Sequence, residues 1–246
     1  MRVEFCGVPG SGKSALCDGA VRVLRERGWP VLGRAAMVDR RLRRRDFGLL
    51  ANTLSAVVPG WREAFLGLRH GMEDWLRFVV RHPAYAARVQ EWIAEPDRTE
   101  EWRRIVFHAV LASAFEYELA CEEERPVLLD EGLSQRFFSL RGYGVRAREG
   151  DAARYAEGMP APAAVVWVAT TPATCLVRVA GRPHVPLLMR NEPSEELPAR
   201  FLEGTQLLAG LSDALEARGI PVLRIEGEGD IEAVIRRVAD FVEGLG

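Results

Sequence analysis

The chain has 246 residues, of which 48% are hydrophobic and 28% are charged, and its formal net charge is −2. This length and composition fit a single globular domain, spanning residues 1–246, with one sizeable core. The near-neutral charge gives no reason to expect a nucleic acid or a membrane surface as partner. No stretch approaches the roughly 20 apolar residues that span a bilayer. No apolar leader precedes the first strand, so we expect a cytoplasmic protein.

The four cysteines (Cys6, Cys17, Cys121 and Cys175) lie far apart in the sequence and show no metal-ligand spacing. We therefore expect buried free thiols in a reducing compartment rather than a zinc site. The sequence does not specify the oligomeric state, and a homodimer is compatible with it.

The N-terminal residues predict a strand, a glycine loop and a helix. Residues 2–6 form a short, mostly apolar strand, and residues 13–27 carry apolar side chains on one helical face before Gly28. Between them lies the pattern Gly7-x-x-x-x-Gly12-Lys13-Ser14, which fits a phosphate-binding P-loop in its expected context. The residues expected to bind a nucleoside triphosphate are Gly7, Pro9, Gly10, Ser11, Gly12, Lys13, Ser14 and Ala15.

The chemistry of phosphate binding explains these residue types. Glycines let backbone N–H groups turn inward around phosphates, and the helix N-terminus adds partial positive charge. Lys13 is expected to reach the β- and γ-phosphates, and the Ser14 hydroxyl to bind Mg²⁺. Lys13 is the only lysine among 33 basic residues. Arginine, being bulkier and planar, would fit poorly as a point charge in this loop.

Residues 30–32 give a weak strand signal, and residues 40–124 read as a helical insertion without a strand. Prolines divide the insertion, and Thr99 is expected to cap its last and longest helix, which should run to about Glu124. Tryptophans at positions 61, 75, 92 and 102 lie within it. We expect most of its aromatic side chains to form helix core.

Residues 127–130 form an apolar run that ends in Asp130, and Glu131 follows. A carboxylate at a strand end holds Mg²⁺ in P-loop proteins, which is the role we assign to Asp130. Glu131 is placed to accept a proton from a nucleophile or to help position Mg²⁺. The same geometry suits activation of water by an ATPase or of an acceptor by a kinase. A purely structural turn, with Asp130 as a helix cap, is the alternative.

The second half predicts helices at 133–140, 172–180 and 197–218, strands at 163–169 and 221–225, and a last helix from Ile231 to Val242. The alternation implies an α/β fold with a mostly parallel sheet covered on both faces. Arg178 and Arg182 lie where a helix enters the loop 181–193. Phosphoryl transfer needs positive charge around the transferring group, which these two arginines would supply.

In the P-loop and from Val127 onward, the chain resembles P-loop kinases of the thymidylate kinase-like group, which includes nucleotide and nucleoside kinases. The best-matching stretch, residues 166–182, looks like that family's strand, proline-started helix and RxxxR lid entry. The resemblance implies a three-layer P-loop fold with a five-stranded sheet of order 2-3-1-4-5, a lid over residues 181–193, and ATP as donor. It also implies that Arg178 contacts ATP.

Three departures from that family stand out. Glu131 follows Asp130 where an arginine is usual, and Arg136 would supply the missing charge from the next helical turn. The acidic-Arg-Glu-Pro-Gly motif after the second strand is reduced to Gly33-Arg34, and the helical insertion has no counterpart. The acceptor is therefore not identified.

The sequence favours an ATP- and Mg²⁺-dependent kinase acting on a small-molecule acceptor: a nucleotide, a nucleoside or another hydroxyl- or phosphate-bearing metabolite. Its expected catalytic residues are Lys13, Glu131, Arg136, Arg178 and Arg182. The first alternative is a P-loop ATPase or GTPase-like switch acting on a protein partner. A second is a nucleotide-binding module without catalysis, against which the presence of Lys13, Ser14, Asp130 and Glu131 argues. The chain has neither an LSGGQ-like signature nor a guanine-specific Asn/Thr-Lys-x-Asp motif.

Overall fold

A computed structural model describes residues 1–44, 71–142, 147–182 and 195–246. The strands are β1 (Arg2–Cys6), β2 (Leu32–Gly33), β3 (Val127–Leu129), β4 (Ala164–Ala169) and β5 (Val222–Glu226). The helices are α1 (Lys13–Glu26), α2 (Arg34–Arg44), α5 (Gly71–Arg81), α6 (Pro83–Ile93), α7 (Glu100–Cys121), α8 (Leu133–Arg141), α9 (Asp151–Gly158), α10 (Pro172–Ala180), α11 (Leu197–Ala217) and α12 (Ile231–Glu243). No helix in these ranges is long and apolar enough to cross a bilayer.

The five strands form one parallel sheet of order β2-β3-β1-β4-β5, which confirms the predicted topology. The register pairs Glu4 of β1 with Leu129 of β3, so the chain leaves β3 at Asp130 beside the last residues of β1. The P-loop and the acidic strand end therefore emerge from neighbouring strands at the same edge of the sheet.

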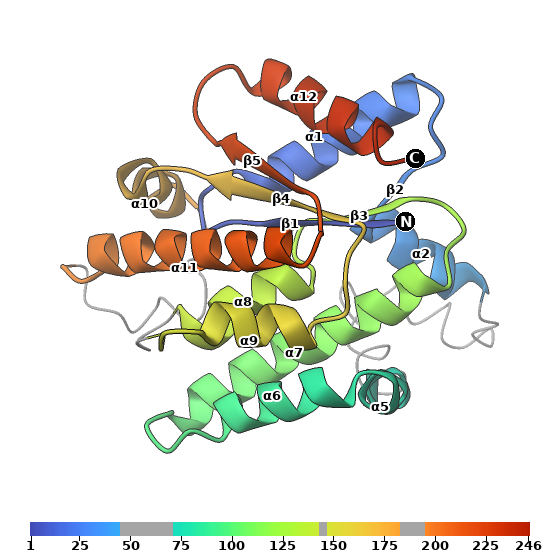
Figure 1. The fold of residues 1–246 in the computed structure, drawn as a ribbon. Helices are drawn as coiled ribbons and strands as arrows, with labels where there is room; N and C mark the ends of the chain where they lie inside the picture. Colours follow the sequence, from blue (N-terminus) through green and yellow to red (C-terminus); the bar gives the residue numbers. More distant parts are fainter. Residues whose placement is uncertain (45–70, 143–146, 183–194) are drawn as a thin grey trace, which may run out of the picture.

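Two buried clusters on opposite faces of the sheet explain its layers. Val3 and Phe5 of β1 pack with α1 and α12, whereas Cys6 belongs to the cluster that includes side chains from α8, α9 and α11. The alternation follows from the period of two along a strand. Figure 1 shows α1 and α12 above the sheet and α8, α9 and α11 below it. The three-layer arrangement is thus the predicted one.

The described part of the helical insertion adds further helices beneath α8 and α9 (Figure 1). Trp75, Trp92 and Trp102 are buried, as expected for helix core, and join the same cluster as the lower face of the sheet. Thr99 caps α7, its Oγ1 accepting from the Trp102 N–H at 3.1 Å, as predicted. Trp61 lies outside the described residues.

Several predicted boundaries need correction. The weak strand at 30–32 is the two-residue strand Leu32–Gly33, and α2 starts at Arg34, before the predicted insertion at residue 40. Helix α7 ends at Cys121 rather than near Glu124, since the chain must turn there to enter β3. Helix α9 was not predicted. Apart from Gly181 and Arg182, the predicted lid 181–193 lies outside the described residues.

All four cysteines are free. Cys6, Cys17 and Cys175 are buried, as expected, but Cys121 is exposed because it sits at the solvent-facing end of α7.

Candidate active site

The loop between β1 and α1 has the backbone conformation that phosphate binding needs. Gly10 and Gly12 have φ values of 82° and 97°, a backbone region that residues other than glycine rarely adopt. Gly10 is also packed tightly: a Cβ there would lie 2.4 Å from the carbonyl oxygen of Cys175. Helix α1 begins at Lys13, so its free N–H groups and positive end adjoin the loop. The loop can therefore bind an anion.

Lys13 is buried at the start of α1. Burial lowers the pKa of its ammonium, and Arg136 and Arg182 act in the same direction, while Glu131 and Asp130 oppose them. Lys13 Nζ lies 3.7 Å from Glu131 Oε1. The lysine is thus a desolvated cation with a carboxylate partner, and an incoming phosphate would compete for it.

Glu131 is held between two cations. Besides its contact with Lys13, it accepts a hydrogen bond of 2.8 Å from Arg136 Nη2. Partial burial works against its charge, but Arg136 and Lys13 outweigh that effect and hold the pKa of Glu131 below its usual value. The structure therefore brings together three residues predicted from sequence, although they are 118 and 5 positions apart in the chain.

Helix α8 carries Arg136 and is fixed to the end of β1 by two side chains that the sequence analysis did not single out. The Gly7 N–H donates to Gln135 Oε1 at 3.0 Å. Glu4, fully buried on β1, accepts from both the N–H and the hydroxyl of Ser134 at 2.8 Å. A lone glutamate inside the apolar run Val3–Cys6 was the available signal for this role.

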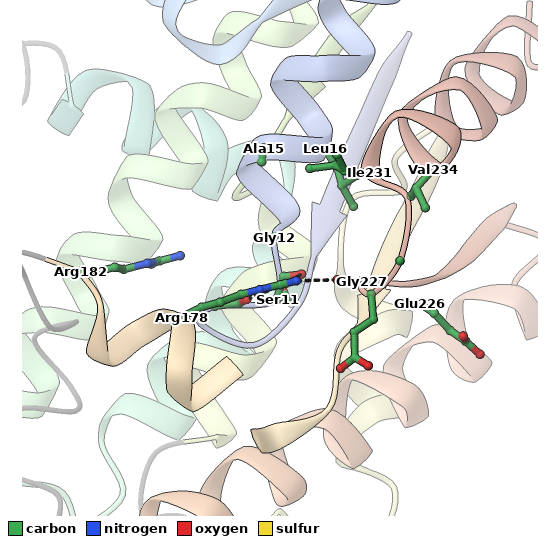
Figure 2. A pocket seen from close by; sticks show the side chains of 13 residues that line it. Ser11, Gly12, Ala15, Leu16, Arg178, Arg182, Glu226, Gly227, Ile231 and Val234 are labelled. Carbon is green, nitrogen blue, oxygen red and sulfur yellow. Dashed lines mark hydrogen bonds between the residues drawn. The ribbon is translucent and has the colours of Figure 1, made fainter. Parts of the chain in front are cut away.

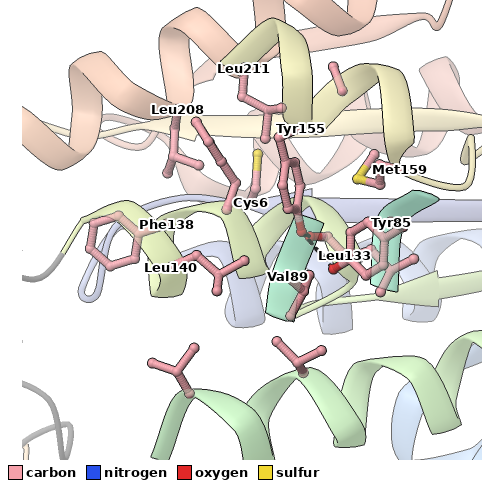
Figure 3. Packing of buried hydrophobic residues seen from close by; sticks show 14 of the residues in the cluster. Cys6, Tyr85, Val89, Leu133, Phe138, Leu140, Tyr155, Met159, Leu208 and Leu211 are labelled. Carbon is pink, nitrogen blue, oxygen red and sulfur yellow. Dashed lines mark hydrogen bonds between the residues drawn. The ribbon is translucent and has the colours of Figure 1, made fainter. Parts of the chain in front are cut away.

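The first residue of α8, Leu133, is held by a pair of buried tyrosines. Tyr155 on α9 donates to the Leu133 carbonyl at 2.6 Å, and the hydroxyls of Tyr155 and Tyr85 lie 2.8 Å apart. Figure 3 shows these rings pointing toward Leu133 within the buried cluster. Since Tyr155 donates to Leu133, Tyr85 must donate to Tyr155.

The potential Mg²⁺ ligands are a hydroxyl and a carboxylate, which are oxygen donors of the kind this ion prefers. Ser14 lies in the first turn of α1 and is exposed, and Asp130 follows β3 directly. Asp130 acts electrostatically on Lys13 and, after the effect of burial, raises the pKa of Cys17, so it lies close to the start of α1. The donor set fits Mg²⁺ bound together with phosphate and water oxygens.

Arg178 bridges the P-loop and the segment between β5 and α12. Its Nη1 lies 3.3 Å from the carbonyl oxygens of Gly10 and Ser11, and its Nη2 donates to the Gly227 carbonyl at 3.1 Å. Figure 2 shows its guanidinium lying across the loop toward Gly227, with Arg182 on the other side of the P-loop. Both predicted arginines thus lie at the P-loop, and Arg178 is engaged with backbone oxygens.

A cavity of about 300 Å³ lies beside the P-loop, on the side of β5 and α12 (Figure 2). It is lined by Gly10, Ser11, Gly12, Ala15, Leu16, Arg178, Arg182, Glu226, Gly227, Glu228, Gly229, Ile231 and Val234. The residues from Glu226 onward were not among the predicted site residues. Their only sequence signal was the glycine-rich turn Gly227-Glu228-Gly229 after the last strand.

No family model and no curated protein sequence matches the chain. Among solved structures, it is similar to deoxyadenosine kinase from M. mycoides with bound dATP, with a TM-score of 0.49 and 11% identity over 99% of this chain and 100% of that one. The same enzyme with bound dCTP gives a TM-score of 0.49 and 9% identity over 99% and 100% of the two chains. Shikimate kinase from Bacteroides thetaiotaomicron gives a TM-score of 0.46 and 12% sequence identity, with 99% of this chain and 98% of that chain covered.

The strand order and the glycine loop together define a P-loop NTPase fold. At these identities the similarity concerns the course of the backbone alone.

Proposed function

We propose that the chain is an ATP-dependent kinase that transfers the γ-phosphoryl group to a small-molecule acceptor. The carrying observation is the position of Lys13. It is buried at the P-loop, beside the ion pair of Glu131 and Arg136. The cavity lined by Arg178 flanks the same loop.

In this proposal the phosphates of ATP lie along the P-loop and the nucleoside enters the flanking cavity. Leu16, Ile231 and Val234 give that cavity an apolar wall suited to the face of a base. Ser14 and Asp130 would hold Mg²⁺, which neutralises phosphate charge when bound. Arg178 on α10 and Arg182, two residues after the end of that helix, approach the donor.

The transfer step requires charge stabilisation and a proton acceptor. An acceptor oxygen attacks the γ-phosphorus, the bond from phosphorus to the β,γ-bridging oxygen breaks, and ADP leaves. Lys13 and Arg136 stabilise the transferring charge. The proton of the acceptor passes to Glu131, which becomes available once the phosphates have replaced it at Lys13 and Arg136. Membership of the thymidylate kinase-like group and a lid over residues 181–193 stay predictions.

Two measurements test the proposal. Lys13→Ala should abolish ATP binding or turnover, and full activity in that variant would remove the site assignment. The wild-type protein should hydrolyse ATP slowly alone and release ADP much faster with one compound of a metabolite panel. Rapid hydrolysis without any acceptor, stimulated only by a protein, would instead indicate the switch function.

A further inference from the structure

A second polar cluster lies on the other side of the P-loop from the donor cavity. Strand β2 pairs with β3 so that Gly33 lies opposite Leu128, which places Arg34 level with Leu129 and one residue short of Asp130. Arg34 is the first residue of α2. It therefore stands beside the carboxylates at the end of β3, where parallel sheets bind ligands.

Arg34 is held there by a buried carboxylate on α7. Its Nε donates to Glu116 Oε1 at 2.7 Å, and its Nη2 lies 2.6 Å from the same oxygen. The side chain of Glu116 is 4% exposed, whereas that of Arg34 is 53% exposed. Glu116 thus fixes one edge of the guanidinium, and half of the arginine stays accessible.

The other edge of the guanidinium has hydrogen-bonding capacity left. A guanidinium carries five N–H donors, and the bonds to Glu116 engage only Nε and one position on Nη2. Within the described parts of the chain, no other partner accepts from Arg34. A planar fork of this kind matches the two oxygens of a carboxylate or phosphate.

The helix that holds Arg34 also touches the transfer site. One turn before Glu116, the Ser113 hydroxyl donates to the backbone carbonyl of Glu131 at 3.3 Å. Asp130 and Glu131 both interact electrostatically with the guanidinium of Arg34. Arg136 and Asp130 interact in the same way with the carboxylate of Glu116. The Arg34–Glu116 pair and the predicted transfer residues therefore form one electrostatic neighbourhood.

We propose that Arg34, positioned by Glu116, binds an anionic group of the acceptor, a phosphate or a carboxylate. The inference rests on the proposed kinase function and narrows its acceptor to an anionic metabolite. It also gives the helical insertion a role: α7 builds one wall of the acceptor site.

The same helix supplies a matched control. Two residues after Glu116 on α7, Glu118 accepts a hydrogen bond from Arg81 Nη1 at 2.7 Å; the side chain of Glu118 is 1% exposed and that of Arg81 is 54% exposed. This pair joins α7 to α5, away from β3. It reproduces the burial and pairing of Arg34 and Glu116 without their position beside Asp130.

The experiment saturates the full-length protein with Mg²⁺ and β,γ-imido-ATP, so that the P-loop is filled, and then titrates inorganic phosphate at constant ionic strength. Binding is read from calorimetry and from the shift in Tm. We compare wild type with Arg34→Gln, Glu116→Gln, Arg81→Gln and Glu118→Gln. Acetate, titrated in the same way, distinguishes a carboxylate-bearing from a phosphate-bearing acceptor.

Phosphate or acetate should bind the wild-type complex, and its Kd should rise at least about tenfold in Arg34→Gln and Glu116→Gln. The Arg81 and Glu118 variants should keep the wild-type Kd. Unchanged anion binding in Arg34→Gln, equal losses in all four variants, or no anion binding by the wild type would overturn the inference. Failure of the ATP analogue itself to bind would instead overturn the proposed function on which it rests.

Discussion

Lys13, Glu131 and Arg136 form a cluster of two ion pairs beside the P-loop. Glu131 lies 3.7 Å from Lys13 Nζ and 2.8 Å from Arg136 Nη2, so one carboxylate engages both cations. The phosphates of a bound nucleotide would need the same two cations. In the proposed kinase, Glu131 would therefore occupy the phosphate position before the nucleotide binds, and the bound phosphate would displace it.

Replacing Glu131 by Gln should separate binding from turnover. Because a half-exposed ion pair contributes about 0.2–1 kcal/mol, loss of this competitor should tighten ATP binding by a factor of about 1.4 to 5. Turnover should fall by about 10² or more, since the proton acceptor is gone. Calorimetry and steady-state kinetics measure the two effects. Glu91→Gln, which removes a surface pair with Arg88, is the control. Weaker ATP binding in Glu131→Gln would contradict this displacement by phosphate.

The lowered pKa of Glu131 also predicts a pH dependence. Its folded pKa lies below the ordinary value of 4.5, so the ionised form stabilises the folded chain above that value. This contribution should be constant from neutral pH down to about pH 5 and should be lost as pH falls through the folded pKa. Urea unfolding of wild type and Glu131→Gln between pH 3 and 7 gives the difference. A difference that grows toward acid would have the wrong sign.

Helix α8 is the element that ties the sheet to the site. Glu4 accepts from the Ser134 N–H, which lies in the first turn of the helix, and pairs with Arg2 Nε at 2.9 Å. Space is tight, because a Cβ on Gly132 would lie 2.4 Å from Glu4 Cδ. Through this contact β1 sets the position of Arg136 two residues further on.

Ser134→Ala should lower the free energy of unfolding by about 1 kcal/mol, as expected for one lost hydrogen bond. Glu4→Ala should cost about 3–5 kcal/mol, because it leaves Arg2 buried without its carboxylate. Urea denaturation measures both losses. Ser212→Ala on α11, where the buried hydroxyl donates to the Leu208 carbonyl of the same helix, is the control for a helical serine. Turnover should also fall further in Ser134→Ala than in Ser212→Ala, because only the first change loosens α8. Equal turnover in the two variants would mean that α8 is not positioned through this contact.

Elements with strong local patterns could be predicted from the sequence, whereas those set by long-range packing could not. The P-loop and α10 follow from glycine and proline positions, and α10 was predicted to the residue. Helix α9 was missed because it is short, and its burial of Tyr155 depends on contacts with Tyr85 and Leu133 from distant segments. Strand β2 is only two residues long, so its place in the sheet is determined by its pairing with β3 rather than by a local sequence pattern.

The same distinction holds for the site. Lys13 ends the loop that follows β1, and Asp130 and Glu131 follow β3 directly, so strand order predicts that they meet. The pairing of Arg34 with Glu116 joins positions 82 apart, and no local pattern specifies it. The far wall of the cavity likewise depends on how β5 and α12 return to the P-loop.

At the scale of the whole molecule, one buried cluster runs from the sheet into the helical insertion. It joins Val165 and Trp167 of β4 to Trp75 and Trp92 of α5 and α6. Arg141 at the end of α8 adds a polar tie: Nη1 bonds to Glu95 after α6. The insertion therefore shares one hydrophobic core with the P-loop, whose Val8 belongs to the same cluster.

This continuity predicts that the chain unfolds as one cooperative unit. Trp92 is fully buried, stacks on Tyr155 at 5.8 Å and lies beneath the Arg141 guanidinium at 4.1 Å, so Trp92→Ala should cost about 3–5 kcal/mol. Far-UV circular dichroism and release of a fluorescent ATP analogue should follow the same urea transition, shifted equally in the variant. Leu76→Ala, at an exposed position of α5, should change stability by less than about 0.5 kcal/mol. If Trp92→Ala unfolded the helices while nucleotide stayed bound, the insertion would be a separate folding unit, and α7 could not be a fixed wall of the acceptor site.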